Sequence, residues 1–213
     1  MIPFNKEDFL MEGESIDDLN RNGLVIIQSD KGFKFGMDAV LLSGYAKADK
    51  GEKVLDMCSG NGIIPLLLSA KTEADKIVGI ELQEYPAEMA LRSLRLNRFL
   101  GEKRARCDAP DLDRIKIVKG DVREADKIFA PNSFDVITCN PPYIKDEGGI
   151  KNPDSAKRIA RHDVELTLDE MLAAAFRLLK DKGRIYIVHR TFRLTELINS
   201  MHIHGIEAKR LRM

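Results

Sequence analysis

Several groups of polar residues in this chain follow directly on apolar, strand-like segments. Open parallel sheets bind ligands at the carboxyl ends of their strands, where the winding direction switches. Polar residues that follow such strands are therefore candidates for one common site. The groups are Asp56-Met57-Cys58-Ser59-Gly60-Asn61-Gly62, Glu81, Gly120-Asp121-Val122 and Asn140-Pro141-Pro142-Tyr143.

The first group is a loop with two glycines, which permit a positive φ and let a ligand approach the backbone closely. A dinucleotide-binding fingerprint needs a third glycine where this chain has Pro65, so the loop disfavours a nicotinamide cofactor. Asp56 suits a ligand that carries an ammonium group and no phosphate. An ordinary tight turn between strand and helix is the alternative. The contacts that the loop predicts for a cofactor are Asp56, Ser59, Gly60, Asn61 and Gly62.

Acidic residues also stand at the ends of the next two strands. Glu81 follows the loop at the distance, about 20 residues, at which an acid accepts both hydroxyls of a ribose. Asp121 can accept a hydrogen bond from the amino group of a bound adenine, while the Val122 amide meets a ring nitrogen. A solvated glutamate and a helix N-cap at Asp121 are the structural alternatives. Three acids at consecutive strand ends favour a bound nucleoside, with Leu82 as a further predicted contact.

The fourth group, Asn140-Pro141-Pro142-Tyr143, follows its strand without a gap. Proline fixes its own φ and restricts the residue before it, so this loop is stiff. The side-chain oxygen of Asn140 and the carbonyl of Pro141 can then offer two acceptors to one –NH₂ group. A turn without a function is the alternative, because Asn-Pro commonly opens turns.

Paired acceptors on a stiff loop suit one kind of chemistry. An aromatic or amide –NH₂ is a poor nucleophile because its lone pair is delocalised. Two fixed acceptors pull the nitrogen toward tetrahedral geometry and aim the lone pair at a methyl donor, without a strong base. Stacking of Tyr143 on a flat target would contribute about 1–3 kcal/mol.

The segments that position these groups alternate between strand and helix patterns. Residues 24–28 and 33–35 predict an N-terminal hairpin, and residues 39–46 predict the helix after it. Apolar strands joined by helices indicate an α/β fold of Rossmann type, with a parallel sheet covered on both faces. The predicted strands are 54–57, 76–81, 115–118, 134–139 and 184–189, and the helices between them are 63–70, 86–100 and 167–179.

Length and composition limit the possible classes of protein. The 213 residues suffice for one domain, and we expect residues 1–48 to form an extension packed on a core domain of residues 49–213. No stretch is apolar enough for a membrane span, and the N-terminus does not resemble a signal peptide. Cys58 and Cys139 in apolar strand-end contexts indicate free thiols and a cytoplasmic location. The histidines lack ligand spacing, so no metal is predicted.

The charge balance leaves RNA binding open. The 34 basic and 34 acidic side chains give no net charge, which argues against bulk electrostatic attraction of polyanions. A compact basic stretch beside the Asn-Pro-Pro-Tyr loop can contact RNA phosphates, and a charged helix face is the alternative. Its predicted contacts are Lys157, Arg158, Arg161 and His162.

Together these groups resemble the amino-methylating class of seven-stranded methyltransferases. Within that class the sequence is similar to the bacterial tRNA (adenine-N6) methyltransferases that modify a purine beside the anticodon of valine tRNA. The resemblance extends from about residue 23 to the end of the chain. It includes Gly32-Phe33-Lys34-Phe35-Gly36-Met37-Asp38-Ala39-Val40-Leu41-Leu42 near the N-terminus and Ile159-Ala160-Arg161-His162 beyond the Asn-Pro-Pro-Tyr loop.

The resemblance implies roles for these residues. S-adenosyl-methionine would be the cofactor, and Phe35-Gly36 would close over its methionine end. Residues 140–143 would hold the target base, which the family places in tRNA. The residues that would hold the cofactor are Asp56, Gly60, Gly62, Glu81 and Asp121.

The sequence departs from the family pattern at three places. Cys58 stands where such loops often have glycine, and the loop of residues 101–113 is longer than expected. The chain ends at Met213, where the class usually adds a last antiparallel strand. We therefore expect that strand to be missing and residues 206–213 to lie at an unprotected sheet edge.

The expected function is methyl transfer from S-adenosyl-methionine to the exocyclic amine of adenine in RNA, in tRNA near the anticodon. The same chemistry on a protein glutamine or on guanine of ribosomal RNA is an alternative. A non-catalytic scaffold that binds RNA or nucleosides is a further one, but a binder does not need two acceptors preset on a stiff loop. The sequence makes no prediction of the oligomeric state.

Overall fold

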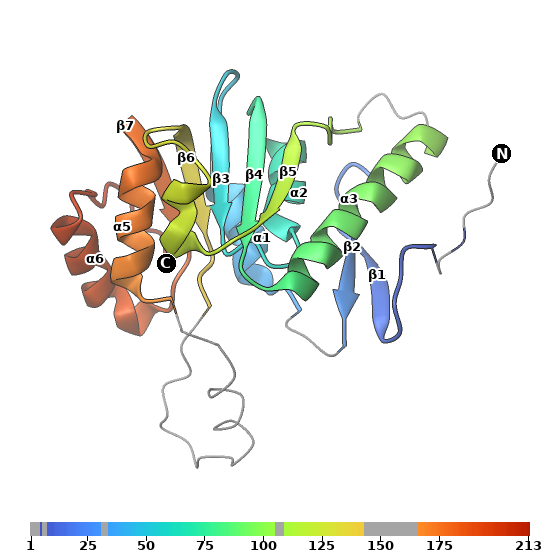
Figure 1. The fold of residues 1–213 in the computed structure, drawn as a ribbon, viewed down its shortest axis with the longest axis horizontal. Helices are drawn as coiled ribbons and strands as arrows, with labels where there is room; N and C mark the ends of the chain where they lie inside the picture. Colours follow the sequence, from blue (N-terminus) through green and yellow to red (C-terminus); the bar gives the residue numbers. More distant parts are fainter. Residues whose placement is uncertain (1–4, 6–7, 31–33, 105–108, 143–165) are drawn as a thin grey trace, which may run out of the picture.

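The structure is a computed structural model that describes residues 5, 8–30, 34–104, 109–142 and 166–213. It has the layered α/β architecture that the sequence predicts, with a parallel sheet between helices (Figure 1). A separate two-stranded unit near the N-terminus lies beside helix α3 (Glu84–Arg104).

The central sheet has five strands in the order β5-β4-β3-β6-β7, and all neighbours run parallel. The chain winds outward from β3 through β4 to β5 and then returns to the other side of β3, so the winding direction switches between β3 and β6. Strands β4 and β6 have the predicted bounds. The bounds are β3 (Lys53–Met57), β4 (Lys76–Glu81), β5 (Ile115–Lys119), β6 (Phe134–Cys139) and β7 (Leu179–Ile187).

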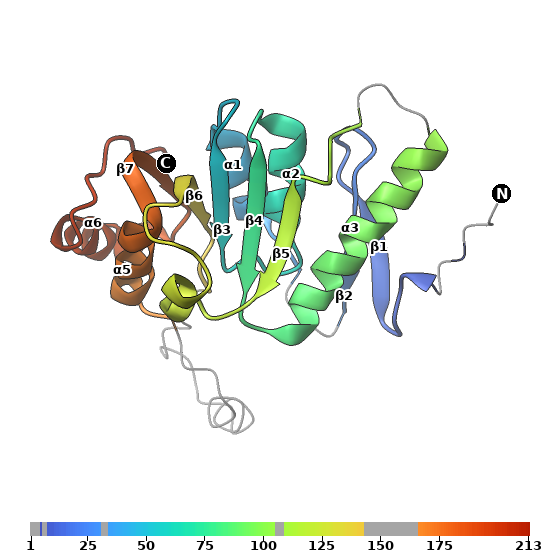
Figure 2. The same cartoon turned by 45° about the horizontal axis from the view of Figure 1, so that its top comes forward.

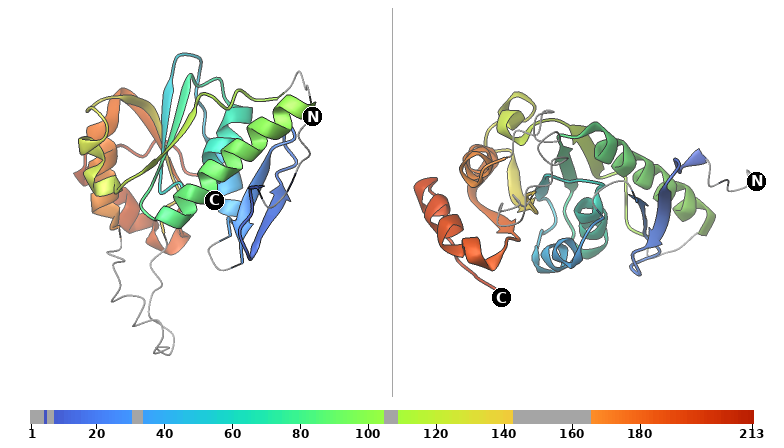
Figure 3. Two further views of the ribbon diagram at one scale, coloured as in Figure 1. Left: turned by 45° about the vertical axis from the view of Figure 1, so that its right-hand side comes forward. Right: turned by 90° about the horizontal axis from the view of Figure 1, so that it is seen from below.

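Alternate residues along the strands point to opposite faces and build two apolar cores. Val54 and Ile77 belong to the core under the first three helices, whereas Leu55 and Ile80 belong to the core under the C-terminal helices. Figure 3 shows the two groups on opposite sides of the sheet. The first group is α1 (Met37–Tyr45), α2 (Ile63–Lys71) and α3; the second is the 3-10 helix η2 (Val122–Lys127), α5 (Leu168–Leu178) and α6 (Leu194–Ile203), which follows the short 3-10 turn η3 (Thr191–Arg193).

The N-terminal hairpin is present, but the prediction of its second strand is wrong. Strand β2 (Val25–Ser29) pairs antiparallel with β1 (Glu14–Asp18), whereas the sequence suggested residues 33–35 as its partner. The chain reverses before β2, where two asparagines and a glycine adopt positive φ within residues 19–24. Asparagine and glycine tolerate that conformation best, so the turn forms there.

Polar side chains of α3 fix the hairpin to the rest of the molecule. Asn97 accepts a hydrogen bond from the Val25 amide (2.8 Å) and donates one to the Val25 carbonyl (2.7 Å). The Ile27 amide donates to the Ser93 hydroxyl at 3.0 Å. These bonds occupy backbone groups that a strand edge otherwise leaves unpaired, so β2 is held against α3 (Figure 2).

A buried ion pair reinforces the same contact. Arg92 on α3 donates to Glu14 on β1, with Nη2 at 2.6 Å from Oε1, and the two side chains are almost fully buried. The Tyr85 hydroxyl donates to the same carboxylate at 2.8 Å. Burial opposes ionisation of Glu14, but hydrogen bonds from Arg92, the Met11 amide and Tyr85 outweigh it and lower the pKa of Glu14 to about 2.

Strand β7 forms one edge of the sheet, and the described part of the sheet has five strands, as many as the sequence predicts. After β7 the chain forms η3 and the amphipathic helix α6, whose Leu197 is buried against α5. Residues 206–213 were expected to lie at an unprotected sheet edge, and they form no regular structure. A groove of about 1580 Å³ lies along β7 and α6. The acids predicted to bind the cofactor, Asp56, Glu81 and Asp121, do not line this groove.

Among the described residues, none of the helices combines the length and apolar character that crossing a membrane requires.

Candidate active site

The strand-end groups meet at one edge of the sheet. Strand β3 lies between β4 and β6, and Met57 is in register with both Ile80 and Cys139. Because the strands are parallel and in register, the residues that follow Met57, Ile80 and Cys139 lie at the same edge of the sheet. The structure therefore brings the glycine loop, Glu81 and Asn140 together at the switch point, as the sequence predicts, with Asp121 one strand further out.

The glycine loop turns sharply after β3. Gly60 and Gly62 have φ of 55° and 83°, and Cys58 also adopts a positive φ, 58°. Cys58 therefore occupies a left-handed position, which accounts for the glycine often found there in the family that the sequence resembles. A Cβ on Gly62 would lie 3.0 Å from the Cβ of Ala90 on α3, so the loop packs tightly against that helix.

Glu81 holds this loop in place. One oxygen of the buried carboxylate accepts from the Gly60 amide at 2.8 Å, and the other accepts from the Gln83 amide at 2.9 Å. A carboxylate oxygen can accept more than one hydrogen bond. Glu81 therefore fixes the loop and keeps acceptor capacity for a pair of ribose hydroxyls.

Asp56 is the most perturbed acid at this edge. It is fully buried, and its Oδ1 accepts a hydrogen bond from the Thr138 hydroxyl at 2.6 Å. Burial, with a smaller contribution from the charge of Glu81, raises the pKa of Asp56 to about 7, against the lowering effect of the Thr138 and Ser59 hydroxyls. Among the described residues, neither Asp56 Oδ2 nor Ser59 Oγ has a well-formed hydrogen bond. Buried polar atoms without partners indicate a site for a polar ligand.

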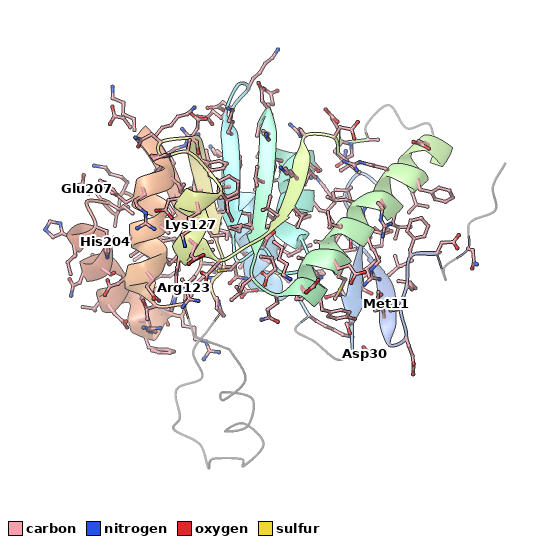
Figure 4. All side chains as sticks on the ribbon, viewed as in Figure 1. Met11, Asp30, Arg123, Lys127, His204 and Glu207 are labelled. Atoms are coloured by element: carbon pink, nitrogen blue, oxygen red, sulfur yellow. The ribbon has the colours of Figure 1, made fainter. Side chains whose placement is uncertain are left out.

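Asp121 has a different environment. Its carboxylate caps η2 by accepting from the Arg123 amide at 2.9 Å, which confirms the N-cap alternative. It also accepts from the Arg123 guanidinium, at 2.6 Å for the closest contact, and this pairing lowers the pKa of Asp121. Arg123 is labelled in Figure 4, beside α5. An adenine amino group would therefore share Asp121 with Arg123.

Asn140 follows β6 directly, next to β3. It is half-buried, Pro141 is buried and Pro142 is exposed. The carbonyl of Cys139 accepts a hydrogen bond from the Val188 amide at 3.2 Å, which anchors the base of the loop to the end of β7. Tyr143 and the predicted RNA contacts Lys157, Arg158, Arg161 and His162 lie outside the described residues.

Phe35 and Gly36 connect the hairpin to α1. The Phe35 amide donates to the side chain of buried Gln28 at 3.2 Å, and Phe35 packs on the core under α1 and α2. Asn61 of the glycine loop donates to the Ile27 carbonyl at 3.2 Å. The loop and the N-terminal hairpin are thus in direct contact, and closure of Phe35-Gly36 over the donor stays a prediction.

Of the remaining predicted contacts, Leu82 is half exposed at the end of β4, whereas Val122 is buried in the core under α5. The Val122 side chain therefore has a packing role, and only its backbone amide is a candidate for a ligand. Within the described segments, no three His, Cys, Asp or Glu side chains gather as metal ligands do.

Sequence reasoning missed Thr138. It lies in strand β6, where Asp135 is the only other polar residue, and it is fully buried, with its hydroxyl on Asp56. A buried-strand hydroxyl was a visible signal in the sequence. The sequence did not show that Asp56 is its partner, because the register between β3 and β6 is a property of the folded sheet.

A parallel sheet with a glycine loop and acids at its switch point defines a class of α/β proteins that bind nucleosides. The profile of the "Methyltransferase domain" family matches residues 48–208. The chain belongs to that family.

Curated relatives carry a more specific name. A protein of Bacteroides thetaiotaomicron named tRNA1(Val) (adenine(37)-N6)-methyltransferase is 34% identical over 158 residues, which are 73% of this chain and 59% of that protein. A protein of Photobacterium profundum with the same name is 25% identical over 84% of this chain and 70% of its own length. This chain spans 59–64% of the length of the Bacteroides and Porphyromonas gingivalis relatives.

Solved structures show the same fold. The structure of M. jannaschii TYW2 in complex with AdoMet matches with a TM-score of 0.61 and 15% identity, over 92% of this chain and 75% of that one. P. horikoshii TYW2 in complex with MeSAdo matches with a TM-score of 0.59 and 17% identity, over 92% of this chain and 62% of that one.

Proposed function

We propose that this protein transfers a methyl group from S-adenosyl-methionine to the exocyclic amine of adenine in tRNA. The observation that carries the proposal is the meeting of Asp56, Glu81 and Asn140 at the ends of three adjacent strands. The names of the curated relatives supply the substrate, adenine 37 of a valine tRNA. Cytoplasmic tRNA would be the natural pool, consistent with the free thiols of Cys58 and Cys139.

The residues at the sheet edge fit the methyl donor. Glu81 keeps acceptor capacity for ribose hydroxyls, and the positive φ of Gly60 and Gly62 lets a ligand approach the loop backbone. Buried Asp56 has an oxygen without a hydrogen-bond partner among the described residues, which suits the ammonium group of the donor's methionine part. Phe35-Gly36, Ser59, Asn61, Leu82, Asp121 and Val122 complete the proposed cofactor contacts.

When bound, the donor supplies an electrophilic methyl group on sulfonium. Asn140 and the Pro141 carbonyl bind the two hydrogens of the target –NH₂ and orient its lone pair toward that methyl group. The prolines hold these acceptors in place before the target arrives, so little reorganisation accompanies the reaction. Tyr143 stacks on the base, and Lys157, Arg158, Arg161 and His162 contact RNA phosphates.

The test is transfer of labelled methyl from S-adenosyl-methionine to total RNA and, separately, to total protein. Label in adenine of tRNA is expected. Label only in protein, or in guanine of ribosomal RNA, would overturn the substrate assignment. Donor binding without any transfer would favour the non-catalytic scaffold.

A variant pair tests the role of Asn140. Asn140→Ala removes one of the two acceptors and should lower turnover by about 100-fold or more, with donor affinity nearly unchanged. Asn199→Ala, at an exposed position of α6, is the matched control and should leave turnover unchanged. Near-normal turnover in Asn140→Ala would refute the assigned role.

A further inference from the structure

Three polar residues form a buried cluster beneath the glycine loop. Asp56 and Thr138 are register partners on β3 and β6, and both are fully buried. Ser59 lies above Gly79, the register partner of Asp56 on β4, because a Cβ on Gly79 would come within 2.4 Å of Ser59 Oγ. The absence of a side chain at Gly79 thus makes room for the Ser59 hydroxyl beside the carboxyl group.

The hydrogen bonds within the cluster are unequal. Thr138 donates to Asp56 Oδ1 at 2.6 Å, whereas Asp56 Oδ2 and Ser59 Oγ are buried and have no well-formed bond among the described residues. The charged group that acts on the pKa of Asp56 is Glu81, which is also an acid. The cluster therefore contains a buried carboxyl with one fixed oxygen, one open oxygen and no cation from the described residues.

We propose that Thr138 is a positioning residue for the methyl donor: it holds Asp56 Oδ1, so that Oδ2 receives the donor's ammonium group, and donor binding expels a proton from this carboxyl. The inference rests on the proposed cofactor site. In the free protein the carboxyl is neutral up to near pH 7, since burial raises its pKa. The bound ammonium stabilises the carboxylate, and the proton leaves to solvent.

The other titratable groups named around Asp56 do not account for this proton release. Glu81 opposes its ionisation, and the Cys139 thiol, on the adjacent strand, has a pKa raised well above its usual value by its contact with Cys58 and by burial. The thiol therefore stays neutral in the range where Asp56 titrates. Ser59 and Thr138 are hydroxyls that do not titrate there.

Calorimetry of S-adenosyl-methionine binding in buffers of different ionisation enthalpy tests proton release. We expect nearly one proton released per donor at pH 6, with affinity several-fold weaker at pH 6 than at its best. At pH 8.5 we expect a net uptake of protons instead, because Asp56 is then already ionised and the free donor's amine, with an ordinary pKa of about 8, must gain a proton to bind as ammonium. 5′-Methylthioadenosine, which lacks the amino-acid part, should bind without proton release. Negligible release at pH 6 would overturn the inference.

Variants assign the effect to Thr138. Thr138→Val removes the hydrogen bond to Asp56 Oδ1. The midpoint of the Asp56 titration in the free protein should then move upward by about one pH unit. Donor affinity relative to the unaltered protein then falls about tenfold at pH 6 and about fivefold at pH 7, and becomes equal near pH 9. Titration of the donor's own amine affects both proteins equally, so it cancels in the ratio of their affinities at one pH. Thr138→Ser should restore the profile, and Thr195→Val, at an exposed site on α6, should not change it.

The outcomes separate the possible explanations. A loss of affinity that is the same at every pH would mean that Thr138 has only a structural role, and would overturn the inference. Unchanged binding of 5′-methylthioadenosine to Thr138→Val shows that the variant is folded. Proton release together with failure to methylate RNA would contradict the proposed function but not this inference. Absence of any donor binding would overturn both.

Discussion

Substitution of Asp56 by asparagine should make the free protein more stable at neutral and alkaline pH. In the unfolded chain this carboxyl ionises near its ordinary pKa of 3.8, whereas in the folded protein it keeps its proton to about pH 7. The contribution of Asp56 to the free energy of unfolding is therefore most favourable below pH 3.8, and it is lost as the pH rises toward 7. Above that pH the folded state holds a buried charge without a counter-ion among the described residues.

The magnitude follows from the two pKa values. Each pKa unit of difference between the folded and unfolded states corresponds to about 1.4 kcal/mol. Relative to low pH, Asp56 therefore lowers the free energy of unfolding by about 2 kcal/mol at pH 5 and by about 4 kcal/mol at pH 8. An asparagine cannot ionise, and its oxygen can still accept from Thr138 while its amide faces Ser59. The difference in unfolding free energy between variant and unaltered protein should thus grow by roughly 2–3 kcal/mol from pH 5 to pH 8.

Urea denaturation at both pH values measures this difference, and equal m-values would show that the unfolded states are comparable. Other ionisable groups are common to both proteins and cancel in the comparison. Asp181→Asn, at an exposed position on β7, should show no such trend. A difference that stays constant between pH 5 and pH 8 would refute the reasoning, because it would mean that Asp56 ionises normally in the folded protein.

Three further substitutions test the fold around the site. Glu14→Ala leaves buried Arg92 without its partner and should cost about 3–5 kcal/mol in urea denaturation at pH 7; a loss below about 1 kcal/mol would contradict the pairing. Gly62→Ala places a side chain at φ 83° against α3 and should cost about 1–3 kcal/mol and weaken donor binding, measured by thermal denaturation and calorimetry. Asn97→Ala should speed amide exchange in β2 at least tenfold while β4 exchanges as before; equal protection in β2 would show that the hairpin does not depend on this side chain.

The parallel sheet and the position of the site could be predicted because they depend on local patterns. The segments that became β4 and β6 are short and mostly apolar, and each leads directly into a polar residue: Glu81 is the last residue of β4, and Asn140 follows β6. Burial on both faces leaves little choice of structure for such a run. Parallel packing then places these residues at one edge, so the position of the candidate site could be predicted, whereas the contact of Thr138 with Asp56 could not.

The N-terminal hairpin was harder because its stability comes from distant residues. Strand β1 has the sequence Glu-Ser-Ile-Asp-Asp, which has little intrinsic preference for a strand. It is stabilised by Arg92, about 80 positions away, while Ser93 and Asn97 bind β2. Two polar residues four apart on a buried helix face were a signal for such a contact, but not for the segment that it would hold.

The stability cost at Asp56 and its usefulness in binding have the same physical origin. A solvated carboxylate attracts an ammonium group weakly, because water screens the charges and competes for both. Burial removes that screening, but it also makes the unliganded carboxylate unfavourable, and the protein avoids the cost by keeping the group protonated. The donor's cation then determines the charge of the cluster. Thr138 lies on β6, two residues before Asn140, so the strand that responds to the donor leads directly into the loop that carries the acceptor for the target amine.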